Sequence, residues 1–397
     1  MKDKRYEVVS QYLKENKVDA YVMSDYENRN PTMVSFLGDK MLTRKIFLVI
    51  KKDHLPILIL HSIDSNFFRG EEKDYELHIY HTWQEMLEEE KKVLADCSTV
   101  LMDMSENGLL PRVSLADYGT VDFIKGLGKK VVSSGDLLEM FSAAYDEEAY
   151  QGQLIACKKA LQIKDEAFHL IKEDILKKGV SDEYRIQQFI CDRFHQEGMV
   201  YDDAAIVAIN ANASNPHYAP SEKEHSPIHK GDVVLIDMWA KLDRKDGVYA
   251  DITWMGYVGE KVPEKVEQRF QILRKAVDSA FAFLEKNLPK RRVEGYEVDD
   301  VARKVVSDAG YGEYFTHRTG HNIAIDVSPH GPGVNMDDYE SHDTRAIIPH
   351  ISFSLEPGIY APDFGMRSET DVYIDSERKP HLVAGRQEHV IPLLSDF

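Results

Sequence analysis

The segment GDVVLIDMWAKLDRKDGVYADITWMGYVG, residues 231–259, predicts two β-strands joined by a polar loop. The loop contains Asp246-Gly247, a dipeptide that is typical of tight turns between strands. Because the side chains of a strand alternate between its two faces, Asp237 shares a face with the apolar residues two positions away, and Asp251 does the same on the second strand. The segment therefore predicts an antiparallel hairpin that carries one aspartate on each strand.

A hairpin centred on Arg244 would place Asp237 and Asp251 directly opposite each other. Like charges at opposed positions destabilise a sheet, and buried carboxylates without partners destabilise it further. A bound cation removes both penalties, and a hard ion such as Mn²⁺ or Mg²⁺ suits oxygen ligands. The alternative, which these two residues leave open, is that one aspartate faces solvent at the edge of the sheet.

A second segment, HRTGHNIAIDVSPHGPGVN at residues 317–335, concentrates His317, His321 and His330 among glycines. The first two histidines have the spacing of a helical zinc site. The Thr-Gly pair between them disfavours a helix, and no glutamate follows the first histidine, so we exclude that motif. A single histidine is more often structural than a ligand, and we assign His317 a structural role. His321 and His330 become candidate site residues only together with the acidic residues of the next segment.

A third segment, SLEPGIYAPDFGMRSETDVYI at residues 354–374, predicts two strands that each carry one inward glutamate. These are Glu356 and Glu369, and Arg367 shares a face with Glu369 because the two residues are two positions apart. Taken alone, Glu356 belongs to an ordinary Glu-Pro-Gly turn, and Arg367 forms a surface ion pair of little energy with Glu369. The segment indicates a site only beside the other two segments.

The three segments together supply two aspartates, two glutamates and one histidine, which are Asp237, Asp251, His321, Glu356 and Glu369. Such a set fits a centre of two divalent ions that lie about 3.5–4 Å apart. Two ions lower the pKa of water towards neutrality, which yields a nucleophile, and they polarise a carbonyl oxygen. The combined pattern therefore indicates metal-dependent hydrolysis.

The rest of the chain predicts two domains. Residues 1–145 have the pattern of a small α/β domain with a largely buried sheet. Its expected strands are 18–23, 46–50, 57–60 and 100–102, and its expected helices include 83–94. Residues 146–397 have the pattern of an α+β domain in which helices cover an antiparallel sheet. Its expected helices are 147–177, one between Ser181 and Gly198, one from Pro263 to 287, and 297–309, and its expected strands are 232–242, 248–258, 351–360 and 366–374.

Composition excludes several classes of partner. The chain of 397 residues has 68 acidic and 49 basic residues, a net charge of −19, whereas nucleic acids and anionic membranes require local positive charge. The chain has three cysteines and no CxxC pair, so we expect free thiols. Its first residues lack the apolar run of a signal peptide, and no 18-residue apolar stretch occurs, so we expect a cytoplasmic protein without a membrane span.

The order Asp, Asp, His, Glu, Glu resembles that of the pita-bread metallopeptidases: methionine aminopeptidase, aminopeptidase P and prolidase, with creatinase as a relative without metal. The resemblance implies a pita-bread catalytic domain, a curved antiparallel sheet covered by helices, after a smaller creatinase-like α/β domain. It also implies a homodimer with two divalent metal ions, manganese first and cobalt, zinc or iron as alternatives.

The same resemblance implies a role for each of the five acidic and imidazole side chains. Asp251 and Glu369 would bridge the two ions. Asp237 would bind one ion, and His321 and Glu356 would bind the other. Glu356 would also accept a proton from the attacking water.

Two further residues are similar to the proline-specific branch of the family. The segment Asn-Pro-His-Tyr-Ala-Pro at residues 215–220 is similar to its His-Tyr-x-Pro motif. This likeness implies that His217 contacts the substrate and stabilises the intermediate. The Arg-x-Glu arrangement implies that Arg367 helps to fix the substrate.

The chain also departs from the family pattern. Where relatives have Gly-His-Gly-Ile-Gly, residues 320–324 are Gly-His-Asn-Ile-Ala, and the loop between the two aspartates is longer. The position of a second substrate histidine holds Ser328, and we expect His330 to take that role after a local shift. These changes affect the substrate pocket and leave the metal ligands in place.

The expected function is hydrolysis of the N-terminal Xaa-Pro bond of dipeptides or short peptides. The alternative is a metal-dependent hydrolase or lyase of a small metabolite on the same scaffold, which the change at Ser328 favours. Creatinase-like chemistry and an inactive binding module both fit less well, because such relatives lack metal ligands that this chain retains.

Overall fold

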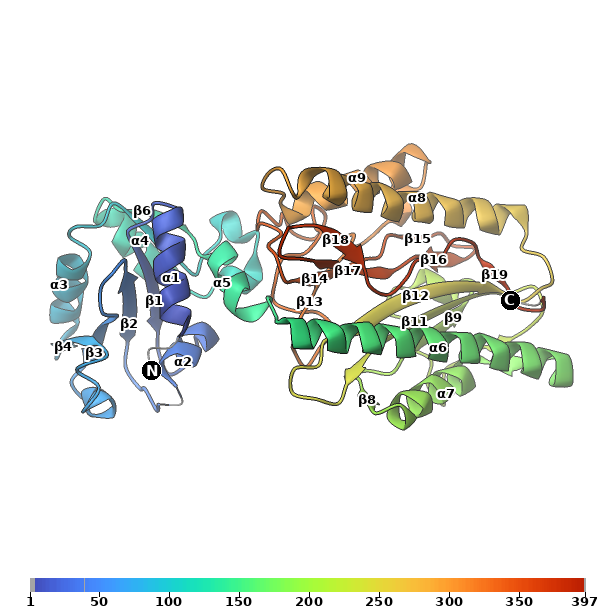
Figure 1. Ribbon diagram of the computed structural model, residues 1–397, viewed down its shortest axis with the longest axis horizontal. Helices are drawn as coiled ribbons and strands as arrows, with labels where there is room; N and C mark the ends of the chain where they lie inside the picture. Colours follow the sequence, from blue (N-terminus) through green and yellow to red (C-terminus); the bar gives the residue numbers. More distant parts are fainter. Residues whose placement is uncertain (1–3, 39, 396–397) are drawn as a thin grey trace. The chain divides into compact units, whose positions relative to one another are not determined.

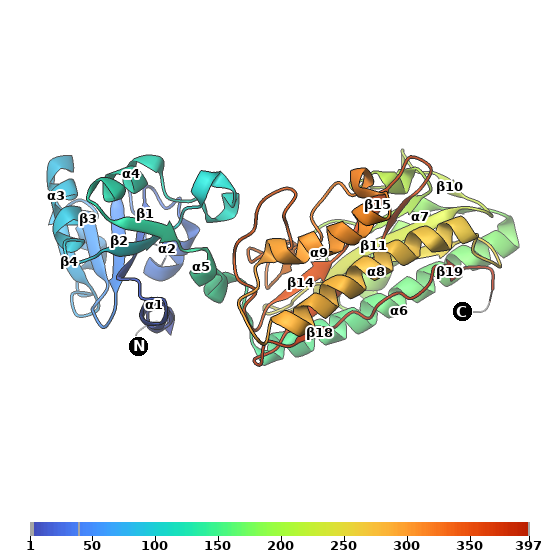
Figure 2. The ribbon, with the colours of Figure 1, turned by 90° about the horizontal axis from the view of Figure 1, so that it is seen from above.

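The computed structural model describes residues 4–38 and 40–395. The chain divides into two compact units, Met1–Phe141 and Ser142–Phe397 (Figures 1 and 2). The predicted boundary after residue 145 differs from this division, because Ala143 and Tyr145 are buried in the core of the second unit. The outer ends of the two predicted domains, at residues 1–3 and 396–397, lie outside the described residues.

The first unit is an α/β fold with a mixed sheet (Figure 1). Its strands are β1 Ala20–Asp25, β2 Ile46–Lys51, β3 Ile57–His61, β4 Glu76–Tyr80, β5 Thr99–Met102 and β6 Lys130–Ser133. Its helices are α1 Lys4–Glu15, α2 Pro31–Leu37, α3 Trp83–Val93, α4 Tyr118–Gly126 and α5 Gly135–Ser142, the last of which ends where the second unit begins. The spatial order of the strands is β4-β3-β2-β1-β5-β6.

Both faces of this sheet are buried, as its continuous apolar runs predict. In β2, Leu48 and Ile50 pack with α1 and α2 on one face, whereas Phe47 and Val49 pack with α3 and α4 on the other. The sequence does not predict β4 and β6, because both are edge strands with exposed residues and no continuous apolar run.

The helices of the second unit are α6 Glu147–Lys178, α7 Glu183–Gln196, α8 Glu264–Asn287 and α9 Gly295–Asp308. Asp146 caps α6 by accepting a hydrogen bond from the backbone of Ala149, and Gly179 ends it with a left-handed φ of 80°. The sequence predicts Pro263 as the first residue of α8. It precedes the helix instead, because its ψ of 143° is extended.

The strands of the second unit form several small sheets. They are β7 Ser181–Asp182, β8 Met199–Val200, β9 Ile206–Ile209, β10 Pro227–Ile228, β11 Val233–Leu242, β12 Ala250–Tyr257, β13 Asn322–Ile323, β14 Ser352–Leu355, β15 Gly358–Tyr360, β16 Gly365–Arg367, β17 Thr370–Ile374, β18 Pro380–Leu382 and β19 Ile391–Pro392. One sheet has the order β19-β12-β11-β8, with β9 also paired to β11, and another has the order β13-β14-β17-β18. The strands β15 and β16 pair with each other.

The central hairpin β11–β12 lies between two helical layers (Figures 1 and 2). Val233 and Leu235 pack with α8 and α9, whereas Val234 and Ile236 pack with α6 and α7. This alternation confirms the predicted faces of β11. Asp237 continues the first series, so its carboxylate lies on the α8 and α9 side of the hairpin.

The register of this hairpin differs from the predicted one. Asp237 pairs with Thr253, so Asp251 is its diagonal neighbour on the same face and does not lie directly opposite. The turn explains the difference, because the backbone N–H of Gly247 donates to the carbonyl of Arg244 at 3.0 Å. This bond shifts the centre of the hairpin from Arg244 towards the second strand.

The strands predicted at 351–360 and 366–374 are each broken in two. The strand β14 pairs with β17, whereas β15 pairs with β16. The chain passes from β14 to β15 at Glu356, and it passes from β16 to β17 at Glu369. Pro357 has no backbone N–H, so a continuous ladder cannot run through the first break. Both glutamates therefore lie between strands, and the prediction that they lie within strands is wrong.

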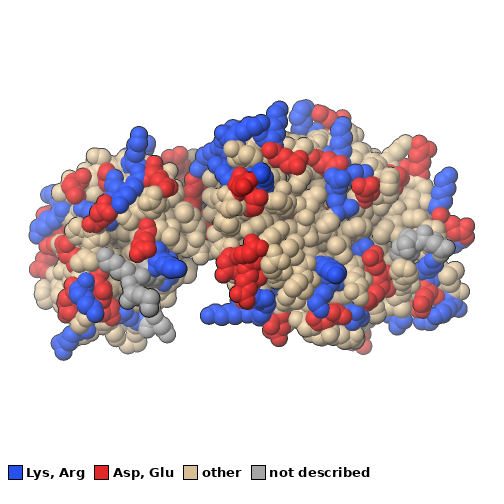
Figure 3. Space-filling view, in the orientation of Figure 1, with Lys and Arg blue, Asp and Glu red and all other residues tan. Residues whose placement is uncertain are grey.

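Several features of composition are visible on the molecule. Acidic and basic side chains are interspersed over the face drawn in Figure 3. Among residues 4–38 and 40–395, no helix is long and apolar enough to cross a membrane. The cysteines Cys97, Cys157 and Cys191 are free and buried, as expected.

A buried glutamate makes the stability of the first unit depend on pH. Glu90 of α3 is 3% exposed, and its Oε1 has no hydrogen-bond partner. Burial raises the pKa of Glu90 to about 8, while the charge of Lys45 lowers this pKa and the charge of Asp117 raises it. This pKa exceeds the unfolded value of 4.5, so folding favours the protonated form of Glu90. The resulting contribution to the free energy of unfolding is full below pH 4.5 and is lost as the pH rises through about 8.

We therefore expect Glu90→Gln to change stability little at pH 5 and to stabilise the protein at pH 9. The gain should be on the order of a few kcal/mol, because each pKa unit corresponds to about 1.4 kcal/mol. The free energy of urea unfolding at the two pH values measures this difference. The control is Glu88→Gln on the same helix, whose side chain is 63% exposed and which should show no such dependence. Equal effects of both variants at pH 9 would contradict the assignment.

Candidate metal centre

One cavity in the second unit brings together every residue that the sequence predicts for the site. It has a volume of about 780 Å³. Its walls include the predicted metal ligands and the other predicted site residues, namely Asp237, Asp251, His321, Glu356, Glu369, His217, His330 and Arg367. The side chains that meet here therefore come from β11, β12, the loop after β9 and the two strand breaks.

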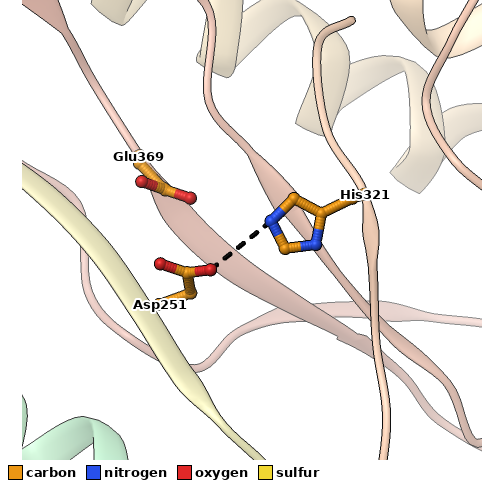
Figure 4. Close-up of side chains that lie close together, drawn as sticks. All are labelled: Asp251, His321 and Glu369. Carbon is orange, nitrogen blue, oxygen red and sulfur yellow. Dashed lines mark ion pairs between the residues drawn. The ribbon is translucent and has the colours of Figure 1, made fainter. Parts of the chain in front are cut away.

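Asp251, His321 and Glu369 form the centre of this cluster (Figure 4). Each offers one ligand atom, and these atoms all lie within 4.8 Å of one another. His321 Nε2 lies 3.4 Å from Asp251 Oδ2, and His321 Nδ1 lies 3.1 Å from the carbonyl oxygen of Asn322. With its proton on Nδ1, the ring directs the lone pair of Nε2 into the cluster, as a metal-ligating imidazole requires.

Glu356 approaches the cluster from the break after β14. Its Oε1 lies 3.5 Å from His321 Nε2 and accepts a hydrogen bond from the hydroxyl of Ser354 at 3.1 Å. Its backbone N–H donates to the carbonyl of Thr319 at 2.7 Å, which anchors the break itself. The carboxylate is therefore held at the edge of the cluster, beside the imidazole.

Asp237 is held by Arg367. The Arg367 side chain is 5% exposed and pairs with Asp237 through Nη2. Its Nε donates to the hydroxyl of Thr253 at 2.9 Å, and its Nη1 donates to the hydroxyl of Tyr360 at 3.0 Å. The Thr253 hydroxyl donates in turn to Glu369 at 2.6 Å. Arg367 Nε also lies 3.8 Å from Glu369 Oε2, so the ion pair considered for these two residues is present but buried.

Burial and mutual repulsion oppose the charges of this cluster. Burial, and then repulsion by Asp237, raises the pKa of Asp251 well above its ordinary value. Burial, and then repulsion by Asp251 and Glu356, raises the pKa of Glu369 in the same way. Burial lowers the pKa of His321, which keeps its imidazole neutral. A cation among these groups would remove the repulsion and stabilise the carboxylates in their charged forms.

The residues of the cluster fit divalent metal ions. The donors are carboxylate oxygens and one imidazole nitrogen, and they converge in a buried site. Such a set suits Mn²⁺, Fe²⁺, Co²⁺ and Zn²⁺, whereas a thiolate site would favour softer ions.

His217 and His330 line the cavity from exposed positions. The ring of His330 packs edge-on against the ring of His321, with centroids 4.1 Å apart. Ser328 also lines the cavity, and its hydroxyl accepts a hydrogen bond from the backbone N–H of His330 at 3.3 Å. The imidazole beside the cluster thus comes from His330, and its role as the second substrate histidine stays a prediction.

Asn322, one of the departures from the family pattern that the sequence resembles, fills space beside two later glycines. Its side chain accepts the N–H of Gly333 and donates to the carbonyl of Ser352, each at 2.9 Å. A Cβ atom on Gly331 would lie 2.4 Å from Asn322 Oδ1, and one on Gly333 would lie 2.7 Å from Asn322 Cγ. The two glycines therefore make room for the amide, which tethers the segment that follows His330.

His317 lines the cavity as well. Its Nε2 lies 2.6 Å from the hydroxyl of Tyr360, and its Nδ1 lies 2.6 Å from the carbonyl oxygen of Arg318. Burial, and then the positive charge of Arg367, lowers its pKa to about 3. These bonds agree with the structural role expected for His317, and the fixed neutral ring also forms part of the cavity wall.

Sequence reasoning assigned no role to Thr253, Tyr360 or Asp371. Asp371 is buried, and its Oδ2 accepts the backbone N–H of Asp251 at 3.0 Å and the thiol of Cys157 at 3.5 Å. Alternation along β12 was a usable signal for Thr253, which lies two residues after Asp251. Tyr360 and Asp371 could be placed only once the strand breaks were known.

Comparisons with known proteins agree with this geometry. Residues 156–376 match the sequence profile of Metallopeptidase family M24. An Xaa-Pro dipeptidase of Lactobacillus delbrueckii subsp. lactis is 27% identical over 396 residues, which cover 96% of this chain and 97% of that protein.

Solved structures share the fold. Dipeptidase PepE from Mycobacterium ulcerans superimposes with a TM-score of 0.62 at 19% identity, covering 98% of this chain and 97% of that chain. An X-prolyl aminopeptidase from Caenorhabditis elegans, described as a cytosolic enzyme with a di-nuclear active site, superimposes with a TM-score of 0.60 at 15% identity. That match covers 96% of this chain and 61% of that chain.

We expect Asp251→Asn to stabilise the metal-free protein and to remove its response to Mn²⁺. The variant relieves repulsion within the cluster, so unfolding in EDTA at pH 8 should cost about 1 kcal/mol more than in the wild type. The wild type should gain about 2.7 kcal/mol when Mn²⁺ is present at 100 times its Kd, and the variant should gain none. Thermal and urea unfolding with EDTA or MnCl₂ measure both effects.

The control for charge alone is Asp308→Asn, since the Asp308 side chain is 65% exposed and lies on α9. This variant should respond to Mn²⁺ as the wild type does. An unchanged Mn²⁺ response in Asp251→Asn would show that the cluster is not the metal centre.

Proposed function

Because this chain belongs to metallopeptidase family M24, we propose that it hydrolyses the bond between an N-terminal residue and a following proline in dipeptides or short peptides. The observation that carries the proposal is the convergence of the acidic cluster with His217, His330 and Arg367 on one cavity. The similarity to an Xaa-Pro dipeptidase along nearly the whole chain supports the same substrate class. The proposal includes a homodimer, which the family resemblance implies.

The proposed centre holds two divalent ions, with manganese as the first candidate. Asp251 and Glu369 would hold both ions, and the mutual proximity of their ligand atoms and that of His321 supports a shared centre. Asp237 would complete one site, and His321 with Glu356 would complete the other. When bound, the ions would lower the pKa of a water molecule and polarise the scissile carbonyl.

The proton transfers of the reaction fall to Glu356. We propose that it accepts a proton from the attacking water and delivers one to the prolyl nitrogen, which must be protonated before it leaves. Its position beside His321 and its bond from Ser354 hold the carboxylate at the cavity wall. Burial raises the pKa of Glu356. A raised pKa suits a carboxyl group that alternately holds and releases a proton during the reaction.

The remaining cavity residues would bind the substrate. His217 and His330 line the cavity from exposed positions, and their imidazoles would donate hydrogen bonds to the carbonyl oxygen as its charge develops. Arg367 is engaged with Asp237, Thr253 and Tyr360, so it would act on the substrate mainly by fixing those neighbours.

A second candidate function is hydrolysis or lysis of a small metabolite, and Ser328 is the observation that favours it. This residue lines the cavity at the position where the family resemblance implies a second substrate histidine. A panel of Xaa-Pro dipeptides, tripeptides and small metabolites, assayed with Mn²⁺, separates the two candidates. Turnover of a metabolite without cleavage of any Xaa-Pro peptide would replace the first proposal.

We expect the Mn²⁺-loaded protein to cleave Gly-Pro or Gly-Pro-Pro, and Asp251→Ala to abolish that cleavage because it removes a bridging ligand. Glu356→Gln should lower kcat by about 10²–10⁴-fold, the usual contribution of a general acid or base, and should weaken metal binding because Glu356 is also a proposed ligand. Release of free glycine measures cleavage, and the ratio of the two rates defines the preference for peptide length. A wild-type rate no higher than that of Asp251→Ala would contradict the proposal.

The roles of His330 and Ser328 can be separated by matched alanine variants. We expect His330→Ala to lower kcat/KM for Xaa-Pro peptides by about 10²-fold, the loss that follows removal of one donor to a developing oxyanion. Ser328→Ala should change kcat/KM much less, since the Ser328 hydroxyl accepts a hydrogen bond from the backbone N–H of His330. A larger loss in Ser328→Ala than in His330→Ala would refute the predicted shift.

A further inference from the structure

Residues 210–225, which make up all but the last residue of the loop between β9 and β10, form one wall of the cavity. The cavity residues that it supplies are Pro216, His217, Ala219, Pro220, Ser221 and Glu222. Its only regular structure is a short 3₁₀ turn, η4 Asn212–Ser214. The shape of the loop therefore depends on bonds to neighbouring elements.

Glu183, the first residue of α7, binds both ends of this loop with one carboxylate. Its side chain is fully buried. Its Oε1 accepts the backbone N–H of Ile209 at 2.8 Å, where the loop begins. Its Oε2 accepts the backbone N–H of Ser226 at 2.7 Å, where the loop ends.

The same carboxylate also binds two side chains within the loop. Asn212 donates through Nδ2 to both carboxylate oxygens, at 3.0 and 3.2 Å. Tyr218, the neighbour of His217, donates its hydroxyl to Oε2 at 2.6 Å. These four donor groups are neutral, so hydrogen bonds compensate the buried charge, and bonds to a charged acceptor are about twice as strong as neutral ones.

Helix capping does not explain this arrangement. Asp182 already caps α7, because its side chain accepts the backbone N–H of Arg185 at 2.9 Å. A glutamate in the first turn of a surface helix interacts weakly with the helix dipole and needs no burial. The complete burial of Glu183 and its bonds to the loop therefore indicate a separate role.

We propose that Glu183 is a positioning residue that holds loop 210–225 in the shape that presents His217 to the cavity. It acts through Tyr218, whose hydroxyl ties the residue next to His217 to α7. This inference rests on the proposed role of His217 in binding the substrate.

The test removes a single hydroxyl. Tyr218→Phe keeps the ring, which packs against the apolar core, and loses only the bond to Glu183. We expect faster amide hydrogen exchange in peptides that cover residues 210–225 and unchanged exchange in α8. The matched control is Tyr373→Phe, whose hydroxyl lies 3.0 Å from His350 Nδ1 and outside the cavity walls.

A double-mutant cycle links the loop to catalysis. Tyr218→Phe alone should lower kcat/KM for Gly-Pro by about 10- to 100-fold, since small displacements of a substrate-binding group have effects of that size. In a His217→Ala background the same change should cost less than about 3-fold, because the group that it positions is gone. The stabilisation by Mn²⁺ should match the wild type in each variant, which separates a shifted loop from a damaged metal centre.

Each outcome bears on the inference. Equal losses of kcat/KM in both backgrounds, or unchanged exchange in residues 210–225, would overturn it. If the wild type cleaves no Xaa-Pro peptide, the proposed function fails, whereas the exchange experiment still decides whether the Glu183–Tyr218 bond orders the loop. Glu183→Gln supplies a second variant, because its amide would place a donor against the N–H groups of Ile209 or Ser226 and should speed exchange further.

Discussion

Repulsion among buried carboxylates is the main constraint on the stability of the second unit. Asp237, Asp251 and Glu369 are each at most 6% exposed, and their charges face one cavity. The guanidinium of Arg367 compensates part of this charge, since it reaches Asp237 directly and Glu369 through the hydroxyl of Thr253. Divalent cations would compensate the remainder, so the ions that support catalysis would also stabilise the fold.

The sequence predicts the features of this site that depend on near neighbours. Alternation along β11 and β12 places Asp237 and Asp251 on one face, and the helices follow from apolar periodicity and their caps. The register of the hairpin depends on a turn bond between Gly247 and Arg244, which the spacing alone did not reveal. The breaks at Glu356 and Glu369 depend on which strands pair, and that pairing joins segments far apart in the chain.

The groups that orient the site were harder to predict, because nothing in their local sequence distinguishes them. Thr253 is an ordinary strand residue until Glu369 and Arg367 are placed around it. Glu183 follows a helix cap, where glutamate is common, and its bonds lead to residues 26–43 positions away. Long-range polar contacts of this kind become visible only in three dimensions.

The contact of Asn322 with Gly331 and Gly333 bears on the evolutionary history of the chain. Neither glycine can gain a side chain while the asparagine is present, because its amide occupies the space. Glycine at position 322 would remove the nearest contact at position 331, where Ala324 would still lie 3.0 Å away, whereas a Cβ atom on Gly333 would still lie 2.6 Å from the Cβ atom of Ala143. Positions 322 and 331 are therefore epistatic, because the amide of Asn322 and a side chain at position 331 exclude each other, whereas Ala143 restricts position 333 independently.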